Sequence, residues 1–257
     1  HTSDFDSLMI NNMYLLATME DYFIPQMRYT YTYTSPSSYL HPIRWETTLA
    51  ESGNGVALYD VLTGKGWNDK NKTMFKNPYS QFLKIETDFT KTWTLDAASK
   101  LVAHINAGYI HYYGNSDGVP NSEMFYVGGA NSVRAFNIRG IGPGAVRSFG
   151  NNAIDYLLRN GTIKFICNLE YRRQLFGNLY GAVFLDAGNV WFRNQDVGEL
   201  NDLYPDMFKN LNFSFNSLFQ SMGVGTGIGL RYDLNFLILR LDWGVALHYP
   251  WETGKSG

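Results

Sequence analysis

The side chains that could carry acid–base or nucleophilic chemistry are few and widely spaced. On or near the predicted strands they are His41, His104, His111 and His248, together with the single cysteine, Cys167. A hydrolase needs a nucleophile within reach of a base, and a structural zinc needs a cluster of ligands. The chain contains no G-x-S-x-G, no H-E-x-x-H and no second cysteine. The sequence therefore predicts a protein that is not an enzyme and that carries no cofactor, metal or disulfide.

Charge and composition narrow the class further. With 21 basic and 23 acidic residues the net charge is −2, so the chain lacks the basic surface that nucleic acid requires. No run approaches the roughly 18 apolar residues of a membrane-spanning helix. Aromatic residues nevertheless make up 16%, more than a soluble core of this size needs. Closed strands are the other structure that can span a bilayer.

The charged and apolar side chains follow a period of two. Between Leu237 and Tyr249 apolar side chains occupy the odd positions, whereas Arg240, Asp242 and His248 occupy even ones. Successive side chains of a strand point to opposite faces, so this pattern predicts a strand between lipid and water. Eight such segments are present, at about 27–33, 43–49, 83–93, 101–109, 163–172, 179–191, 222–232 and 237–249. The pattern is typical of an all-β, antiparallel transmembrane β-barrel.

The connectors between these segments alternate in length. Short ones lie near 35–39, 94–96, 176–178 and 233–235, and long ones near 51–78, 114–161 and 193–216. Outer-membrane barrels have short periplasmic turns and long external loops, which would place both ends of this eight-stranded section outside. We therefore expect residues 1–257 to be an interior section of one barrel of about 16 strands, without its terminal strands or periplasmic domains. Val56, Leu58, Tyr59 and Leu62 in the first long connector fit either a short helix or an irregular loop.

The second long connector contains the most strongly patterned stretch of the chain. Residues 126–144 read YVGGANSVRAFNIRGIGPG, with glycines at 128, 129, 140, 142 and 144. Glycine at this density indicates close backbone approach or positive φ angles. Together with NLEYR at 168–172 and VFLDAGNVW at 183–191, the stretch resembles the BamA/TamA superfamily of outer-membrane assembly and translocation proteins, and within it the TamA-like, TamL-type branch.

Two short motifs carry the resemblance. The family's Val-Arg-Gly-Phe loop signature is matched by Val133, Arg134, Ala135 and Phe136, flanked by Gly128, Gly129 and Arg139. The family's Phe-x-Asp-x-Gly strand is matched by Phe184, Asp186 and Gly188. The resemblance implies that the loop of about 114–161 folds back into the barrel lumen. It also implies that acidic side chains on the two following strands hold the loop arginine.

The alternation by itself points Glu170 and Asp186 inward on adjacent strands, where both could reach one side chain. A guanidinium suits two carboxylates because its planar fork donates in several directions and stays charged, whereas lysine is a compact point charge. We therefore expect Arg134→Lys to be damaging. The sequence leaves open whether this contact only braces the loop or takes part in a working cycle.

Other residues around the loop carry expectations of their own. A row of inward glycines either leaves space for the loop or allows the strand to bend: Gly223, Gly225, Gly227 and Gly229. Phe136 is expected to pack in the lumen, and Arg139 to meet inward acids such as Asp233 or Asp242. Ala135 stands where the family has glycine, so it is either strained at a positive φ or part of a different turn.

The function that the resemblance implies is assembly or insertion of proteins in the bacterial outer membrane, without nucleotide hydrolysis. Its partners would be client outer-membrane or secreted proteins, outer-membrane lipid, and accessory periplasmic or lipoprotein subunits. Two alternatives remain: a two-partner-type secretion translocator, and a passive outer-membrane porin. A plugged assembly barrel should conduct ions poorly or erratically, whereas a porin should stay open.

Overall fold

One antiparallel sheet dominates the computed structural model, which describes residues 22–36, 38–146, 159–193, 211–234 and 236–252. Its eight strands are β1 (Gln26–Thr34), β2 (Ile43–Ser52), β5 (Phe82–Thr94), β6 (Ser99–Tyr112), β7 (Ile163–Phe176), β8 (Leu179–Trp191), β9 (Gly223–Asp233) and β10 (Ile238–His248). Neighbours in the sequence are neighbours in the sheet. The eight predicted strands and their antiparallel order are confirmed.

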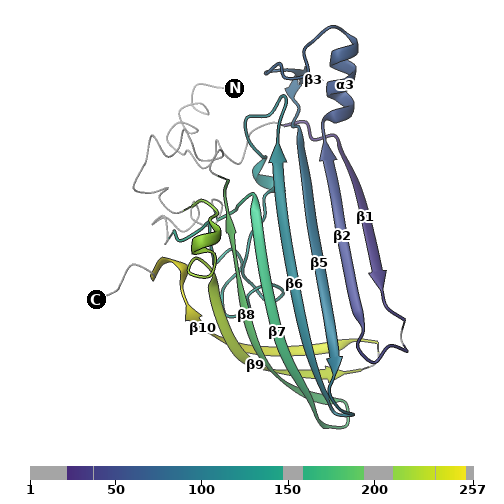
Figure 1. The fold of residues 1–257 in the computed structure, drawn as a ribbon, viewed down its shortest axis with the longest axis vertical. Helices are drawn as coiled ribbons and strands as arrows, with labels where there is room; N and C mark the ends of the chain where they lie inside the picture. Colours follow the sequence, from purple (N-terminus) through teal and green to yellow (C-terminus); the bar gives the residue numbers. More distant parts are fainter. Residues whose placement is uncertain (1–21, 37, 147–158, 194–210, 235, 253–257) are drawn as a thin grey trace, which may run out of the picture.

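The sheet is strongly curved. In Figure 1, β1 and β2 stand upright, whereas β9 and β10 sweep across the lower part of the molecule, so the sheet encloses a concave face. Within the described residues the sheet is open, with β1 and β10 as its two edges. The similarity to a barrel wall is therefore in curvature and topology, and the closed barrel of about 16 strands stays a prediction.

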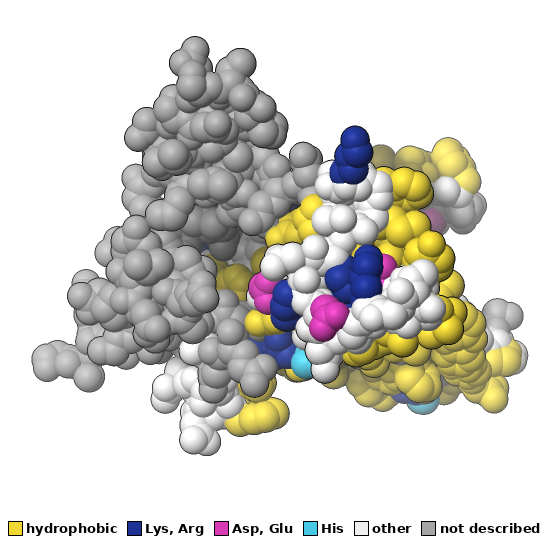
Figure 2. All heavy atoms as spheres, turned by 90° about the horizontal axis from the view of Figure 1, so that it is seen from above, with side chains coloured by type: hydrophobic (Ala, Val, Ile, Leu, Met, Phe, Trp, Pro, Cys, Tyr) yellow, Lys and Arg dark blue, Asp and Glu magenta, His cyan; other side chains and the backbone are white. Residues whose placement is uncertain are grey.

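The period of two assigns side chains to the two faces as expected. On the convex face apolar side chains are exposed, as Trp243 at 70% and Leu241 at 70% show. Seen from above in Figure 2, apolar side chains gather along one outer side of the molecule. On the concave face polar groups are buried instead, and Asp186 is 0% exposed. A wall that is apolar outside and polar inside is the reverse of a soluble domain.

Short turns join the strands at one end of the sheet and long connections join them at the other. The first long connection contains helix α3 (Asn54–Leu62). Of the two alternatives for this segment, a short helix and an irregular loop, the structure therefore has the helix. It also contains a small hairpin that the sequence did not predict, β3 (Thr73–Met74) with β4 (Asn77–Pro78). Among the described residues, no helix is long and apolar enough to cross a bilayer. Residues 147–158 and 194–210 of the other predicted long connectors lie outside the described residues.

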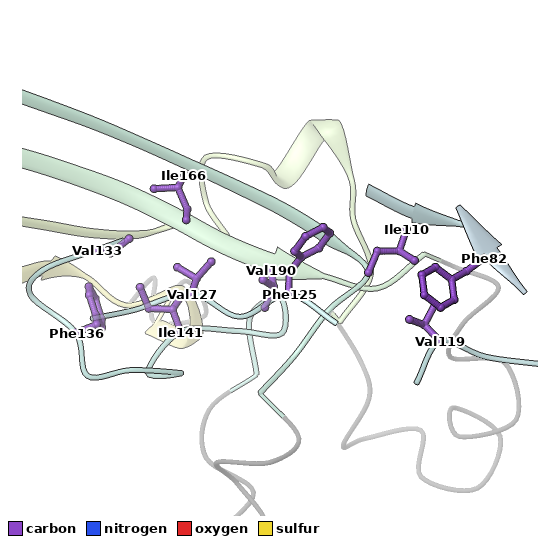
Figure 3. Packing of buried hydrophobic residues seen from close by; sticks show 10 residues of the cluster. All are labelled: Phe82, Ile110, Val119, Phe125, Val127, Val133, Phe136, Ile141, Ile166 and Val190. Atoms are coloured by element: carbon purple, nitrogen blue, oxygen red, sulfur yellow. The ribbon is translucent and has the colours of Figure 1, made fainter. Parts of the chain in front are cut away.

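A hydrophobic core lies on the concave side, between the sheet and the second long connection (Figure 3). The strands contribute Phe82, Ile110, Ile166 and Val190, and the connection contributes Val119, Phe125, Val127, Val133, Phe136 and Ile141. Val127, Val133 and Ile141 are fully buried. The connection is therefore part of the folded interior and not an external loop, because burial of this much apolar surface stabilises its position against the sheet.

Candidate functional site

The tip of this connection, residues 125–141, is a compact turn that we call the inserted loop. Backbone bridges pair Phe125 with Gly161 and Val127 with Ile141. Inside them Gly129 N–H donates to the Phe136 carbonyl at 2.9 Å. Gly128 has φ 116°, and a Cβ there would collide with the Asn137 carbonyl oxygen. This position therefore shows both the positive φ and the close backbone approach that the glycines of the loop indicated.

Arg134 projects from the tip into the sheet, and its side chain is only 7% exposed. Its Nε and Nη2 donate to the two carboxylate oxygens of Asp186, at 2.8 and 2.7 Å. Its Nη1 donates to Glu170, and its backbone N–H donates to Asp186 Oδ2 at 3.0 Å. The arginine–acid contact that the resemblance implied is therefore present, with a bidentate pair to Asp186 and a second carboxylate alongside.

The two acids come from neighbouring strands. In the β7–β8 register Glu170 lies opposite Phe184, and Asn168 lies opposite Asp186, so the acids are diagonal neighbours on the concave face. The Phe184 ring fills the space beneath the guanidinium, whose Cζ lies 3.6 Å from the ring centre. A cation stacked on an aromatic face gains further stabilisation when it is desolvated. The Phe-x-Asp-x-Gly strand thus supplies both a carboxylate and a stacking surface.

Further charged residues extend the contact toward the last strands. Glu170 also accepts from Arg172 Nε at 2.6 Å and from Arg231 Nη2 at 3.0 Å. Arg231 in turn pairs with Asp242, 2.6 Å away. Asp242 also pairs with Arg240 at 3.0 Å, and Arg240 donates to the loop carbonyl of Ala130. Each buried charge therefore has an opposite partner, which burial in a low-dielectric interior requires.

On the other side the network runs through Asn168 and His104, whose part sequence reasoning missed. Asn168 Nδ2 donates to the loop carbonyl of Ser132 at 2.7 Å and to Asp186 Oδ1 at 2.8 Å. Its Oδ1 faces His104 Nδ1 at 2.7 Å, and His104 Nε2 faces Asp88 Oδ2 at 2.7 Å. Both ring nitrogens of His104 therefore lie within hydrogen-bond distance of a side-chain oxygen. The only sequence signal was that these residues share the inward parity.

The inward glycines make room for the loop and for the network. A Cβ on Gly223 would meet the Ile141 side chain, and one on Gly225 would meet Ala135. A Cβ on Gly227 would meet the Phe184 ring, and one on Gly229 would meet Asp242 and Arg231. Gly188 lies against Val133 in the same way. At Gly223 and Gly225 the space that a side chain would take is thus occupied by loop residues.

The remaining predicted site residues have definite places. Phe136 is buried, and its ring packs edge-on against Tyr249 with centroids 5.5 Å apart. Ala135 is not among the residues with positive φ, so the turn differs from one that would need glycine there. Arg139 has φ 56° and its Cζ lies 4.9 Å from the centre of the Tyr126 ring. Its expected contact with Asp233 or Asp242 stays a prediction.

The inserted loop does not fill the whole concave face. A cavity of about 580 Å³ separates it from β5–β7 and is lined by Lys84, Glu86, His104, Asn106 and Lys164, among others. A second space of about 360 Å³ lies on the inner face of β1, β2, β5 and β6. Among the described residues no three His, Cys, Asp or Glu side chains converge as metal ligands.

The comparisons with known proteins agree with this architecture. The Omp85 superfamily domain matches residues 63–257, so the chain belongs to the Omp85 superfamily. Among solved structures it is similar to BamA from Haemophilus ducreyi lacking POTRA domains 1–3, with a TM-score of 0.51 and 15% sequence identity. The match covers 88% of this chain and 52% of that one, so this chain spans about half its length. The BamA/TamA superfamily resemblance is confirmed, whereas the TamL-type branch stays a prediction.

Proposed function

We propose that this protein inserts or translocates other proteins at the bacterial outer membrane, and that it does so without covalent chemistry. One observation carries the proposal: Arg134, at the tip of a long loop, is buried between Glu170 and Asp186 on the concave wall. Membership of the Omp85 superfamily supports the same class of function.

In this proposal the convex face meets lipid and the concave face lines the lumen. The short turns face the periplasm, the long connections face outward, and strands beyond this chain complete a barrel of about 16. The loop of about 114–161 then lies in the lumen. The expected partners are client outer-membrane or secreted proteins, surrounding lipid, and accessory periplasmic or lipoprotein subunits.

The driving force for insertion is the satisfaction of backbone groups. In the hydrocarbon layer each unpaired N–H or C=O costs several kcal/mol, so a client strand gains by pairing with an exposed sheet edge. The assembly barrel supplies that edge and needs no nucleotide. The network around Arg134 keeps the lumen occupied and the wall β7–β10 rigid while the edges open. Glu170 and Asp186 thereby act as positioning residues for the loop.

Conductance tests the proposal against the porin. The full-length protein in a planar bilayer is expected to show low or erratic conductance, and Arg134→Ala to raise it by releasing the loop. A steadily open pore in the unaltered protein would contradict the proposal. The matched control is Arg44→Ala, which removes a salt-bridged arginine on β2 outside the network.

Crosslinking separates insertion from secretion. A photoreactive side chain at Asn106, which lines the cavity on the concave face, reports clients that pass through the lumen. A photoreactive side chain on the first or last strand of the barrel reports clients at the seam, where these two strands meet. Crosslinks mainly at the seam support insertion, whereas crosslinks mainly at Asn106 favour the secretion translocator.

A further inference from the structure

An apolar slot lies on the convex face, on the opposite side of the sheet from the inserted loop. Its floor is two cross-strand rows: Ile85, Tyr109 and Ile163 in one, and Thr87, Ala107 and Phe165 in the next. Its cover is Phe213, Phe215 and Leu218 from the connection between β8 and β9. The space between floor and cover is about 360 Å³.

The cover is held in place by contacts with the end of β8. The Phe213 ring packs edge-on against Trp191 at 5.4 Å and against Phe215 at 4.9 Å. Trp191 is buried, and its Nε1 donates to Ser221 Oγ at 3.0 Å. Phe192 and Phe213 are also joined by a backbone hydrogen bond of 3.0 Å. The described part of the cover is therefore anchored to the end of β8.

A cation lies at the upper end of the slot. Arg193 follows β8 by two residues, and its guanidinium contacts His111 Nδ1 and lies 4.7 Å from the centre of the Tyr112 ring. His111 stacks on Tyr109, a residue of the slot floor, with ring centroids 6.5 Å apart. Arg193 thus lies at the rim formed by the long connections, and the slot runs from the rim down the wall.

We propose that this slot binds one acyl chain of a phosphate-bearing anionic lipid, with the lipid phosphate at Arg193. The apolar lining on a lipid-facing wall fits a hydrocarbon chain and offers a peptide almost no hydrogen-bond partners. A guanidinium at the rim fits a phosphate because it donates two parallel hydrogen bonds and keeps its charge. Aromatic rings beside it match the headgroup depth of the bilayer. The inference rests on the proposed function only for the placement of the convex face in lipid.

Native mass spectrometry of the full-length protein tests the proposal. The protein is equilibrated in detergent with equal amounts of phosphatidylglycerol and phosphatidylcholine that carry the same acyl chains, and retained lipid is counted. We expect phosphatidylglycerol to be preferred about fivefold, the effect of one cation near a lipid phosphate. Arg193→Gln should abolish the preference for phosphatidylglycerol. The control is Lys76→Gln, which removes a positive charge elsewhere in the outer loops and should leave the preference unchanged. Equal retention of the two lipids by the unaltered protein would overturn the proposal.

A second pair of variants tests the acyl chain. Ala107 lies in the slot floor, and Ala103 lies four residues away on the same face of β6, outside the slot. Ala107→Trp should fill the slot and reduce retention of both lipids at least several-fold, whereas Ala103→Trp should leave it unchanged. Equal behaviour of the two variants would overturn the slot. Insertion of the full-length protein itself into phosphatidylcholine vesicles separates the lipid site from the placement of the convex face in lipid. A protein that inserts normally but shows no lipid preference refutes the lipid site alone. A protein that fails to insert refutes both.

Discussion

The two halves of the concave face differ in how their charges are used. On β7–β10 the side chains of Glu170, Asp186 and Arg231 are at most 7% exposed, and each bonds an opposite charge in the network that holds the inserted loop. On β1 and β2 the charges are more exposed, as in the pair Arg44–Glu46, where the arginine side chain is 56% exposed. Because solvent screens exposed pairs, the first half should depend on its charges for stability and the second should not. The charges of β7–β10 therefore support the inserted loop, whereas those of β1 and β2 lie on a solvated face.

The largest expected effect comes from removing one buried acid. Asp186→Ala leaves Arg134 without its bidentate partner, and an uncompensated buried charge costs about 3 to 5 kcal/mol. Urea unfolding in lipid vesicles, followed by tryptophan fluorescence, measures the loss. Glu46→Ala removes an exposed acid on β2 and should cost about 0 to 1 kcal/mol. Equal losses in the two variants would remove the distinction between the halves.

Replacing the loop cation tests geometry apart from charge. Arg134→Lys keeps the positive charge, but an ammonium cannot reproduce the bidentate pair and reach Glu170 as well. We expect a loss of about 2 kcal/mol, the worth of a hydrogen bond to a charged group, and higher bilayer conductance. Arg44→Lys, at the solvated pair, should change neither quantity. If Arg134→Lys behaves as the unaltered protein does, charge alone holds the loop.

A packing change probes the space beneath the loop. Gly225→Ala places a methyl group against Ala135, and overpacking of this kind costs about 1 to 3 kcal/mol. The double variant Gly225→Ala with Ala135→Gly removes the opposing methyl and should recover much of the loss. Gly181→Ala on the same sheet meets only the flexible Leu175 side chain and serves as control. Absence of recovery in the double variant would mean that the glycine serves strand bending.

The last comparison concerns the edge of the network. Asn168→Ala removes the donors to Ser132 and Asp186 and should cost about 1 to 3 kcal/mol, because the Ser132 carbonyl loses its donor. Asn106→Ala, one strand nearer the solvated half, loses longer bonds of 3.1 and 3.3 Å and should cost less. Unfolding midpoints of the two variants give the comparison. A larger loss at Asn106 would place the boundary between the halves elsewhere.

Several features of the molecule were readable without coordinates. The strand segments and the face of each side chain follow from the period of two, because successive side chains of a strand must point to opposite sides. The inward parity of Glu170 and Asp186 came from this rule. The pairing of these two acids with Arg134 needed the family motif as well, because a loop residue has no periodicity that would predict its position.

Only the tertiary structure decided which inward groups meet. Arg231 bridges Glu170 and Asp242, and Asn168 joins the loop to His104, through residues up to 64 positions apart in the chain. These contacts depend on strand register, on the curvature of the sheet and on the path of the inserted loop. The slot beneath Phe213 and Phe215 likewise depends on a connection folding over the convex face. The sequence determined what each face is made of, and the long-range packing determined which groups on that face touch, because local alternation carries no information about distant partners.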